Sequence, residues 1–151
     1  MMKRFLKNER GLTLIELLAV IVILGIIAAI AIPAIGGLID NSKKDAHVSN
    51  AQQMINAAKI AVTADKDLIP DNGKSRNVYL STLEDEGYLE TVKDPDKKDY
   101  NRTSSYVRIT NNNNKLSYSV KLVNTERGVQ TASGGPIAED KLKRSEVRNN
   151  P

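Results

Sequence analysis

The sequence predicts an α+β fold in which a long N-terminal α-helix packs on a small antiparallel sheet. Three patterns predict it: an uncharged apolar run over residues 17–39, apolar side chains at steps of three and four over residues 48–62, and alternation over residues 116–122. The first is typical of a membrane-spanning helix, the second of an amphipathic helix, and the third of a strand with one buried face.

Apolar residues average 40% of the 151 residues but are unevenly distributed. They fill 22 of positions 12–39 and only 35 of positions 40–151, which is sparse beside the roughly 45–50% of an average globular domain. The length allows one modest domain with an appendage. Because the chain has no cysteine, a disulfide framework, a thiolate zinc site and a cysteine nucleophile are excluded.

The uncharged segment Leu17–Ile39 has the length of a membrane span. Its 23 residues extend about 34 Å at about 1.5 Å per residue, and it exceeds the roughly 7–15-residue core of a secretory signal peptide. Asp40 follows it, and four cations precede it: Lys3, Arg4, Lys7 and Arg10. The positive-inside rule therefore predicts a cytoplasmic N-terminus and an external remainder.

Those leading cations also account for most of the net charge of +4. From Leu12 onward the side chains sum to only +1. A nucleic-acid partner is therefore possible but gains no support from charge.

Glu16 does not fit a plain membrane anchor. It lies among four apolar residues of the segment 14–18, and an acid in hydrocarbon costs about 2.5–3.5 kcal/mol if Asp is the guide. Arg10 is six positions back, and no cation lies within helical reach on the C-terminal side. We expect a partner from another molecule or a newly made amino terminus; the alternative is an unpaired position in the headgroup layer.

The string Arg10-Gly11-Leu12-Thr13-Leu14-Ile15-Glu16 closely resembles the prepilin signature of type IV pilins and their pseudopilin relatives. That signature is a short basic leader, a glycine, an apolar residue, Thr-Leu-Ile-Glu and a long apolar run; the family most often has Phe where this chain has Leu12. The resemblance implies that a membrane prepilin peptidase cuts between Gly11 and Leu12 and methylates the new amino terminus.

The resemblance also implies the domain organisation of a pilin. Residues 1–11 would be a leader, 12–39 a transmembrane and polymerisation helix, and 40–151 an extracellular head with a type IV pilin-like fold. Within the head we expect an amphipathic helix over about 40–64, a loop and short helix over 65–100, antiparallel strands over about 105–132 and a polar tail over 133–151.

Processing would give Glu16 a partner, because the Leu12 α-amine can carry charge only after cleavage. Opposite charges at about 4 Å attract by roughly 4 kcal/mol at an effective dielectric near 20. Pairing with a neighbour's amine would set the axial register of a homopolymer, and a pair within one chain is also possible.

Small residues recur every four positions in the apolar run, at Gly25, Ala29, Pro33 and Gly37. This spacing favours close helix approach, although such residues are common in any membrane helix. Pro33 lacks an N–H and crowds the carbonyl of Ala29, which predicts a kink or local unwinding between about Gly25 and Pro33.

Beyond Pro33 the helix is expected to continue through residues 34–64. His47, the only histidine, is expected at a solvated helix position because no second His or Cys can join it in a metal site. The acidic segments 65–73 and 94–99 are expected as solvated loops, since the first fails the calcium-loop pattern. No metal or cofactor is expected.

The remaining head elements follow from local patterns. Residues 80–89 predict a short helix capped by Ser81 or Thr82 and stopped by Gly87. Residues 106–110 and 116–123 predict a hairpin turning at 111–114. A third strand is expected at 129–132, and the tail as a loose helix or exposed arm.

Asn101-Arg102-Thr103 matches the N-glycosylation sequon, a short and common pattern.

The function implied is that of a type IV pilin-like subunit, held in the plasma membrane and then assembled into a surface filament by the pilus machinery. Adhesion, motility, DNA uptake and secretion all remain open, as does a pseudopilin of competence or type II secretion. A single-pass binding module would explain the span but neither Gly11 nor Glu16. An enzyme is not expected, because the chain has one His, no Cys and no Gly-x-Ser-x-Gly.

Overall fold

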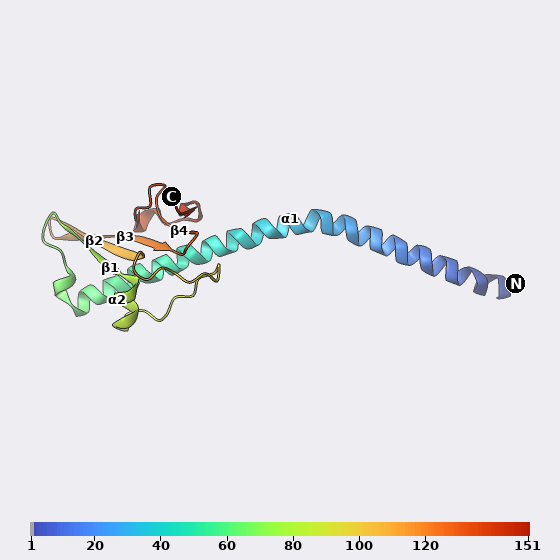
Figure 1. Ribbon diagram of the computed structural model, residues 1–151, viewed down its shortest axis with the longest axis horizontal. Helices are drawn as coiled ribbons and strands as arrows, with labels where there is room; N and C mark the ends of the chain where they lie inside the picture. The colour runs from blue at the N-terminus through green and yellow to red at the C-terminus, as the bar shows by residue number, and fades with distance from the viewer. Residues whose placement is uncertain (1) are drawn as a thin grey trace. The chain divides into compact units, whose positions relative to one another are not determined.

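A computed structural model describes the backbone of residues 2–151 and the side chains from Thr13 onward. The chain divides after Asp40 into two units, Met1–Asp40 and Asn41–Pro151. Helix α1 (Met2–Ala64) contains every described residue of the first unit and continues into the second (Figure 1).

The described part of the first unit is helical from Met2 onward, and Pro33 lies inside the helix. Of the two alternatives expected between Gly25 and Pro33, a kink or local unwinding, the unwinding is not present, because the backbone is helical through this stretch. A proline removes one helical N–H donor, and the bonds of the adjacent turns here hold the helix across the gap.

The second unit buries one face of α1 against an antiparallel sheet, which confirms the predicted α+β class. Ala51, Met54, Ile55 and Ala58 are fully buried on the helix side. The sheet contributes Val107, Ile109, Val120 and Leu122, which are also fully buried. The steps of three and four between the helical residues are the ones seen in the sequence.

The sheet has six strands in the order β1-β2-β3-β4-β6, with β5 pairing separately to β3. Every pairing is antiparallel. The strands are β1 (Ser75–Tyr79), β2 (Tyr106–Asn112), β3 (Lys115–Val123), β4 (Arg127–Val129), β5 (Ile137–Ala138) and β6 (Val147–Asn149).

The predicted hairpin is confirmed as β2 and β3, with Val107 opposite Val120 and Ile109 opposite Tyr118. Its turn is tighter than expected, because only Asn113 and Asn114 separate the strands. Their φ angles of 53° and 64° are left-handed, as a two-residue turn between twisted strands requires.

The short helix is α2 (Leu80–Asp85), and its predicted cap is wrong. The N-cap is Tyr79, which makes no side-chain capping bond, while Ser81 lies inside the helix and donates its backbone N–H to Arg102 O. Tertiary contacts therefore replace the local cap. Gly87, with a φ of 79°, follows the helix end as expected.

Several elements differ from the expected loop and tail. The segment expected as a loop contains the 3-10 helix η1 (Lys66–Leu68) and strand β1. The tail is neither a loose helix nor an arm: it contains β5, η2 (Glu139–Lys141), η3 (Arg144–Glu146) and β6, with Ile137 and Val147 buried. The strand expected at residues 129–132 corresponds to β4 (Arg127–Val129), and the two ranges share only Val129.

Candidate functional site

The first candidate site is the apolar surface of α1 between Leu14 and Ile39. Its large apolar side chains are all more than half exposed, from 51% at Val20 to 71% at Ile30. Among the described residues, α1 is the one helix long and apolar enough to cross a membrane. Such a surface needs either lipid or another protein to cover it.

Glu16 is the only charged residue between Gly11 and Ile39, and its side chain is exposed. It is flanked along the helix by Ile15 and Leu17, which are 65% and 58% exposed. A lone carboxylate on an apolar surface requires a polar partner once lipid or protein covers that surface.

The other expected assembly residues differ in how far the structure describes them. Gly11 and Leu12 are in helical backbone, but their side chains lie outside the described part. At Gly25, a Cβ atom would meet no other atom within 4 Å apart from its own helix backbone, so the single chain leaves this position open. Pro33 lies in the same uninterrupted helix.

The comparison with protein families decides what this segment is. The model of the prokaryotic N-terminal methylation motif matches residues 6–32. The chain carries the type IV pilin-type methylation motif. The motif includes Gly11, Leu12, Glu16 and Gly25 and ends one residue before Pro33. No curated protein and no solved structure matches the chain.

The methylation motif supports a type IV pilin-like or pseudopilin protein, a family of structural subunits, but it covers residues 6–32 alone. It implies processing by a prepilin peptidase and assembly into pilus-like filaments. Together with the apolar helix, it suits membrane anchoring and a cell-surface filament.

A second candidate site lies in the head and overturns a prediction. His47 is fully buried, not solvated. Its Nε2 donates to Asp96 Oδ2 at 2.8 Å, and its Nδ1 lies 2.8 Å from the Tyr100 hydroxyl. Because a carboxylate only accepts, Nε2 carries a proton, and in the neutral ring Nδ1 accepts a hydrogen bond from the Tyr100 hydroxyl.

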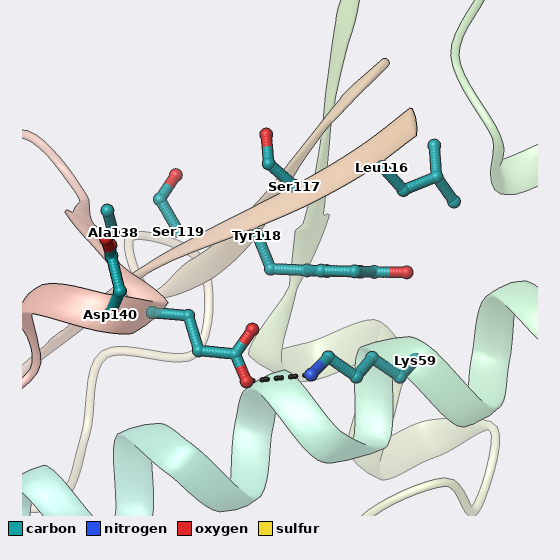
Figure 2. A pocket seen from close by; sticks show the side chains of 8 residues that line it. Lys59, Leu116, Ser117, Tyr118, Ser119, Ala138 and Asp140 are labelled. Carbon is teal, nitrogen blue, oxygen red and sulfur yellow. Dashed lines mark hydrogen bonds and ion pairs between the residues drawn. The ribbon is translucent and has the colours of Figure 1, made fainter. Parts of the chain in front are cut away.

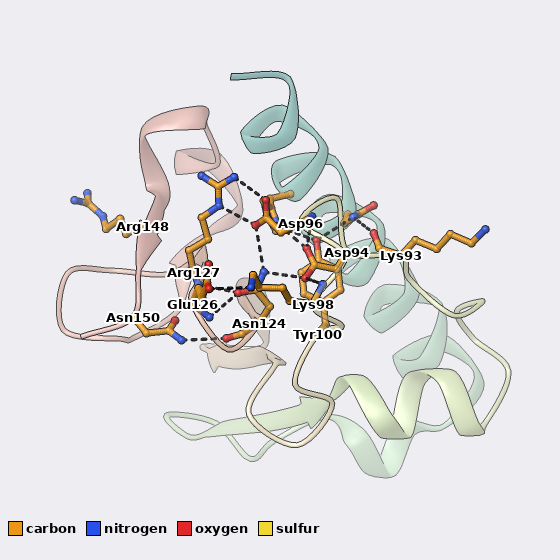
Figure 3. Close-up of polar contacts among 12 residues, drawn as sticks. Lys93, Asp94, Asp96, Lys98, Tyr100, Asn124, Glu126, Arg127, Arg148 and Asn150 are labelled. Carbon is orange, nitrogen blue, oxygen red and sulfur yellow. Dashed lines mark hydrogen bonds and ion pairs between the residues drawn. The ribbon is translucent and has the colours of Figure 1, made fainter. Parts of the chain in front are cut away.

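Asp96 is also bound by Arg127, whose Nε and Nη2 contact Oδ2 and Oδ1 at 2.8 and 2.7 Å. Figure 3 shows the Arg127 side chain beside Asp96, with Asp94, Tyr100 and Asn124 in the same network of polar contacts. The Arg127 hydrogen bonds, aided by His47, hold the pKa of Asp96 well below its usual range. Burial raises the pKa of the Tyr100 hydroxyl, so this tyrosine stays protonated and can donate.

Asn124 completes the cluster between β3 and β4. Its Nδ2 donates to Asp94 Oδ2 at 2.8 Å, and its Oδ1 accepts from the backbone N–H groups of Glu126 and Arg127. Asn150 near the C-terminus donates to the Asn124 carbonyl at 3.0 Å. The cluster therefore links α1, the loop over 94–100, the β3–β4 turn and the tail.

The side chains of His47, Asp94 and Asp96 have ligand atoms within 4.8 Å of one another, which is the spacing of a metal site. Their oxygens nevertheless have donors already. Asp94 accepts from the Asp96 and Lys98 backbone and from Asn124, and Asp96 accepts from Arg127 and His47. This arrangement fits a charge-neutralised network better than a cation site.

The sequence contained a signal for this burial. His47 lies four residues before Ala51 and seven before Met54, in phase with the buried face of the helix. That phase predicts an inward side chain. Its acidic partners are 47 and 49 residues away, and their proximity follows only from the fold.

An open groove of about 600 Å³ lies between α1, β3 and η2 (Figure 2). In this groove, Lys59 Nζ forms an ion pair with Glu139 Oε1 at 2.7 Å. The same nitrogen lies 5.4 Å from the centroid of the Tyr118 ring. Ser117 and Ser119 also line the groove. No histidine is among the residues that line this groove.

Proposed function

We propose that the protein is a structural subunit of a type IV pilus or related filament. It is inserted with its N-terminus in the cytoplasm and its head outside, cleaved between Gly11 and Leu12, methylated at the Leu12 amine, and polymerised through residues 12–39. The observation that carries this proposal is the long exposed apolar segment of α1 over residues 14–39, whose one charge, Glu16, lies inside the methylation motif.

The proposed assembly uses the same apolar surface twice. In the membrane, lipid covers the side chains from Leu14 to Ile39. In the filament, the equivalent helices of neighbouring subunits cover them, so the apolar contacts of the bilayer are exchanged for apolar contacts between subunits.

Glu16 supplies direction and register to contacts that are otherwise non-directional. Cleavage creates a charged amine at Leu12, and the Glu16 carboxylate of a neighbouring subunit is its partner. Opposite charges about 4 Å apart in a water-poor interface attract by roughly 4 kcal/mol at an effective dielectric near 20. A shift of one helix along another would separate the pair.

The second candidate function is a pseudopilin of a competence or secretion system. It uses the same processing and the same helix, and it is favoured by the same methylation motif.

Mass spectrometry of the membrane-extracted protein tests the proposal. In cells that carry prepilin peptidase, we expect the mature chain to begin at Leu12 and to carry one methyl group on its amine. In matched cells without the peptidase, the chain should keep its first eleven residues. An intact, unmethylated N-terminus in both strains would overturn the proposal.

A further inference from the structure

The head contains one Asn-x-Ser/Thr triplet, Asn101-Arg102-Thr103. We propose that Asn101 is an acceptor for N-linked glycosylation, taking its glycan from a polyprenyl-diphosphate-linked oligosaccharide. The proposal rests on the proposed function in one respect, because the head must lie outside the membrane to reach an extracytoplasmic glycosyl donor.

The triplet is on the surface of the head. Asn101, Arg102 and Thr103 are all exposed, whereas Ser105 two residues later is fully buried. A sequon can be used only where a bulky, hydrated glycan can leave the protein surface. The exposed turn meets that requirement without any unfolding of the core.

The Asn101 side-chain oxygen accepts three hydrogen bonds from the two residues after Arg102. This Oδ1 accepts from Thr103 Oγ1 at 2.9 Å, from Thr103 N at 3.1 Å and from Ser104 N at 3.0 Å. Among the described residues, no hydrogen bond engages Asn101 Nδ2, which is the nitrogen that would be modified. The Nδ2 atom is therefore available for modification, while three hydrogen bonds fix the position of Oδ1.

This arrangement suits the chemistry of amide glycosylation. When Nδ2 loses a proton to a base of the transferase, negative charge develops on Oδ1, where the three donors stabilise it. The Nδ2 electron pair then forms a bond to C1 of the first sugar. The bond from C1 to the diphosphate oxygen breaks, and its electron pair leaves with the polyprenyl diphosphate.

The rest of the head holds the turn in place. Asn101 N donates to Val123 O at 2.8 Å, and Ser105 N donates to Asn101 O at 3.0 Å. The Arg102 guanidinium contacts Glu84 and Asp85 of α2 at 2.9 and 2.6 Å. The triplet is therefore presented by the folded head in one conformation.

The test uses the full chain in cells that carry a membrane oligosaccharyltransferase and its polyprenyl-diphosphate oligosaccharide. We expect the peptide containing Asn101 to carry a glycan mass that enzymatic N-glycan release removes, leaving aspartate at position 101. Thr103→Ser should retain the glycan because it keeps the hydroxyl, and Thr103→Val should lose it. Asn113→Gln alters an exposed asparagine outside any sequon and should leave modification unchanged.

Protease accessibility of the head in intact spheroplasts, measured in the same cells, separates this inference from the proposed topology. An unmodified Asn101 on an accessible head would overturn the glycosylation proposal alone. A head protected from protease would overturn the topology and, with it, the acceptor site. Glycan on Thr103→Val at the wild-type level would show that the sequon hydroxyl does not determine the modification and would also overturn it.

Discussion

His47 and Asp96 are 49 residues apart in sequence, and their side chains meet at 2.8 Å between Nε2 and Oδ2. This contact attaches the loop over 94–100 to helix α1, and Arg127 on the same carboxylate attaches β4 to both. The chain has no disulfide to close its loops. The cluster performs that role with buried hydrogen bonds, so the head should depend strongly on it.

Replacing His47 by Ala should lower the free energy of unfolding by about 2–4 kcal/mol, because the Asp96 carboxylate and the Tyr100 hydroxyl each lose a buried partner. Thermal unfolding of the detergent-solubilised full chain, followed by circular dichroism in the near ultraviolet, measures the change.

The matched control is Asp45→Ala, which breaks the pair between Asp45 and Arg144. These side chains are 53% and 50% exposed, so screening by solvent should leave the midpoint nearly unchanged. Equal losses from the two variants would contradict a special role for the buried cluster.

The stability supplied by Asp96 should depend on pH in one direction. Its pKa in the folded head lies below the roughly 3.9 of an unfolded chain, mainly because of the Arg127 hydrogen bonds. Such a carboxylate contributes its full stabilisation of the folded head at pH values above its pKa in the unfolded chain. The contribution declines as the pH falls toward its pKa in the folded head. The difference in unfolding free energy between the wild type and Asp96→Asn should therefore be constant near pH 5 and shrink between pH 4 and pH 2. A difference that grows on acidification would contradict this assignment.

The β2–β3 turn allows a test of backbone conformation. Asn114 has a φ of 64°, which glycine adopts without strain and a β-branched residue resists. Asn114→Gly should preserve stability or raise it slightly, whereas Asn114→Val should lower it by about 1–2 kcal/mol. Chemical denaturation of both variants measures this, and a Val variant as stable as the Gly variant would exclude the left-handed turn.

The sequence predicted those elements that are long enough for a helical or strand pattern of apolar residues to repeat several times. Apolar steps over residues 48–62 predicted the head half of α1, and alternation from Leu116 to Leu122 predicted β3 with its buried Val120. Strands β5 and β6 have two and three residues, too few for any alternation to be visible. Their positions depend on pairing with β3 and β4, which no local pattern encodes.

The two candidate sites also differ in whether the sequence alone could reveal them. The methylation motif and Glu16 are contiguous in sequence and could be recognised without a structure. The cluster around His47 joins residues from four segments, and its partners could not be found by spacing. The lack of a second His or Cys bears on metal binding and not on burial, whereas the helical phase that His47 shares with Ala51 indicates an inward side chain.

Glu16→Ala should be inserted and cleaved normally yet fail to enter filaments. The substitution removes the carboxylate proposed to bind a neighbour's amine and leaves the helix more apolar, which favours insertion. The ratio of sheared surface filaments to membrane-bound mature subunit measures assembly. Glu16→Asp keeps the charge and should assemble better than Ala. Wild-type filament yield from the Ala variant would remove the pairing argument.

Gly25→Leu should also reduce filament yield, for a different reason. Apart from its own helix backbone, nothing lies within 4 Å of a Cβ atom at this position, so the single subunit accommodates the larger side chain. Leucine is at least as apolar as glycine, and membrane insertion should continue. If helices approach each other closely at Gly25, the added side chain holds them apart and weakens assembly. Ile23→Leu changes an exposed apolar residue of the same helix with little change in volume and should assemble normally. Equal yields from Gly25→Leu and Ile23→Leu, at equal levels of mature protein, would place Gly25 on a lipid-facing or solvent-facing surface and not at a helix contact.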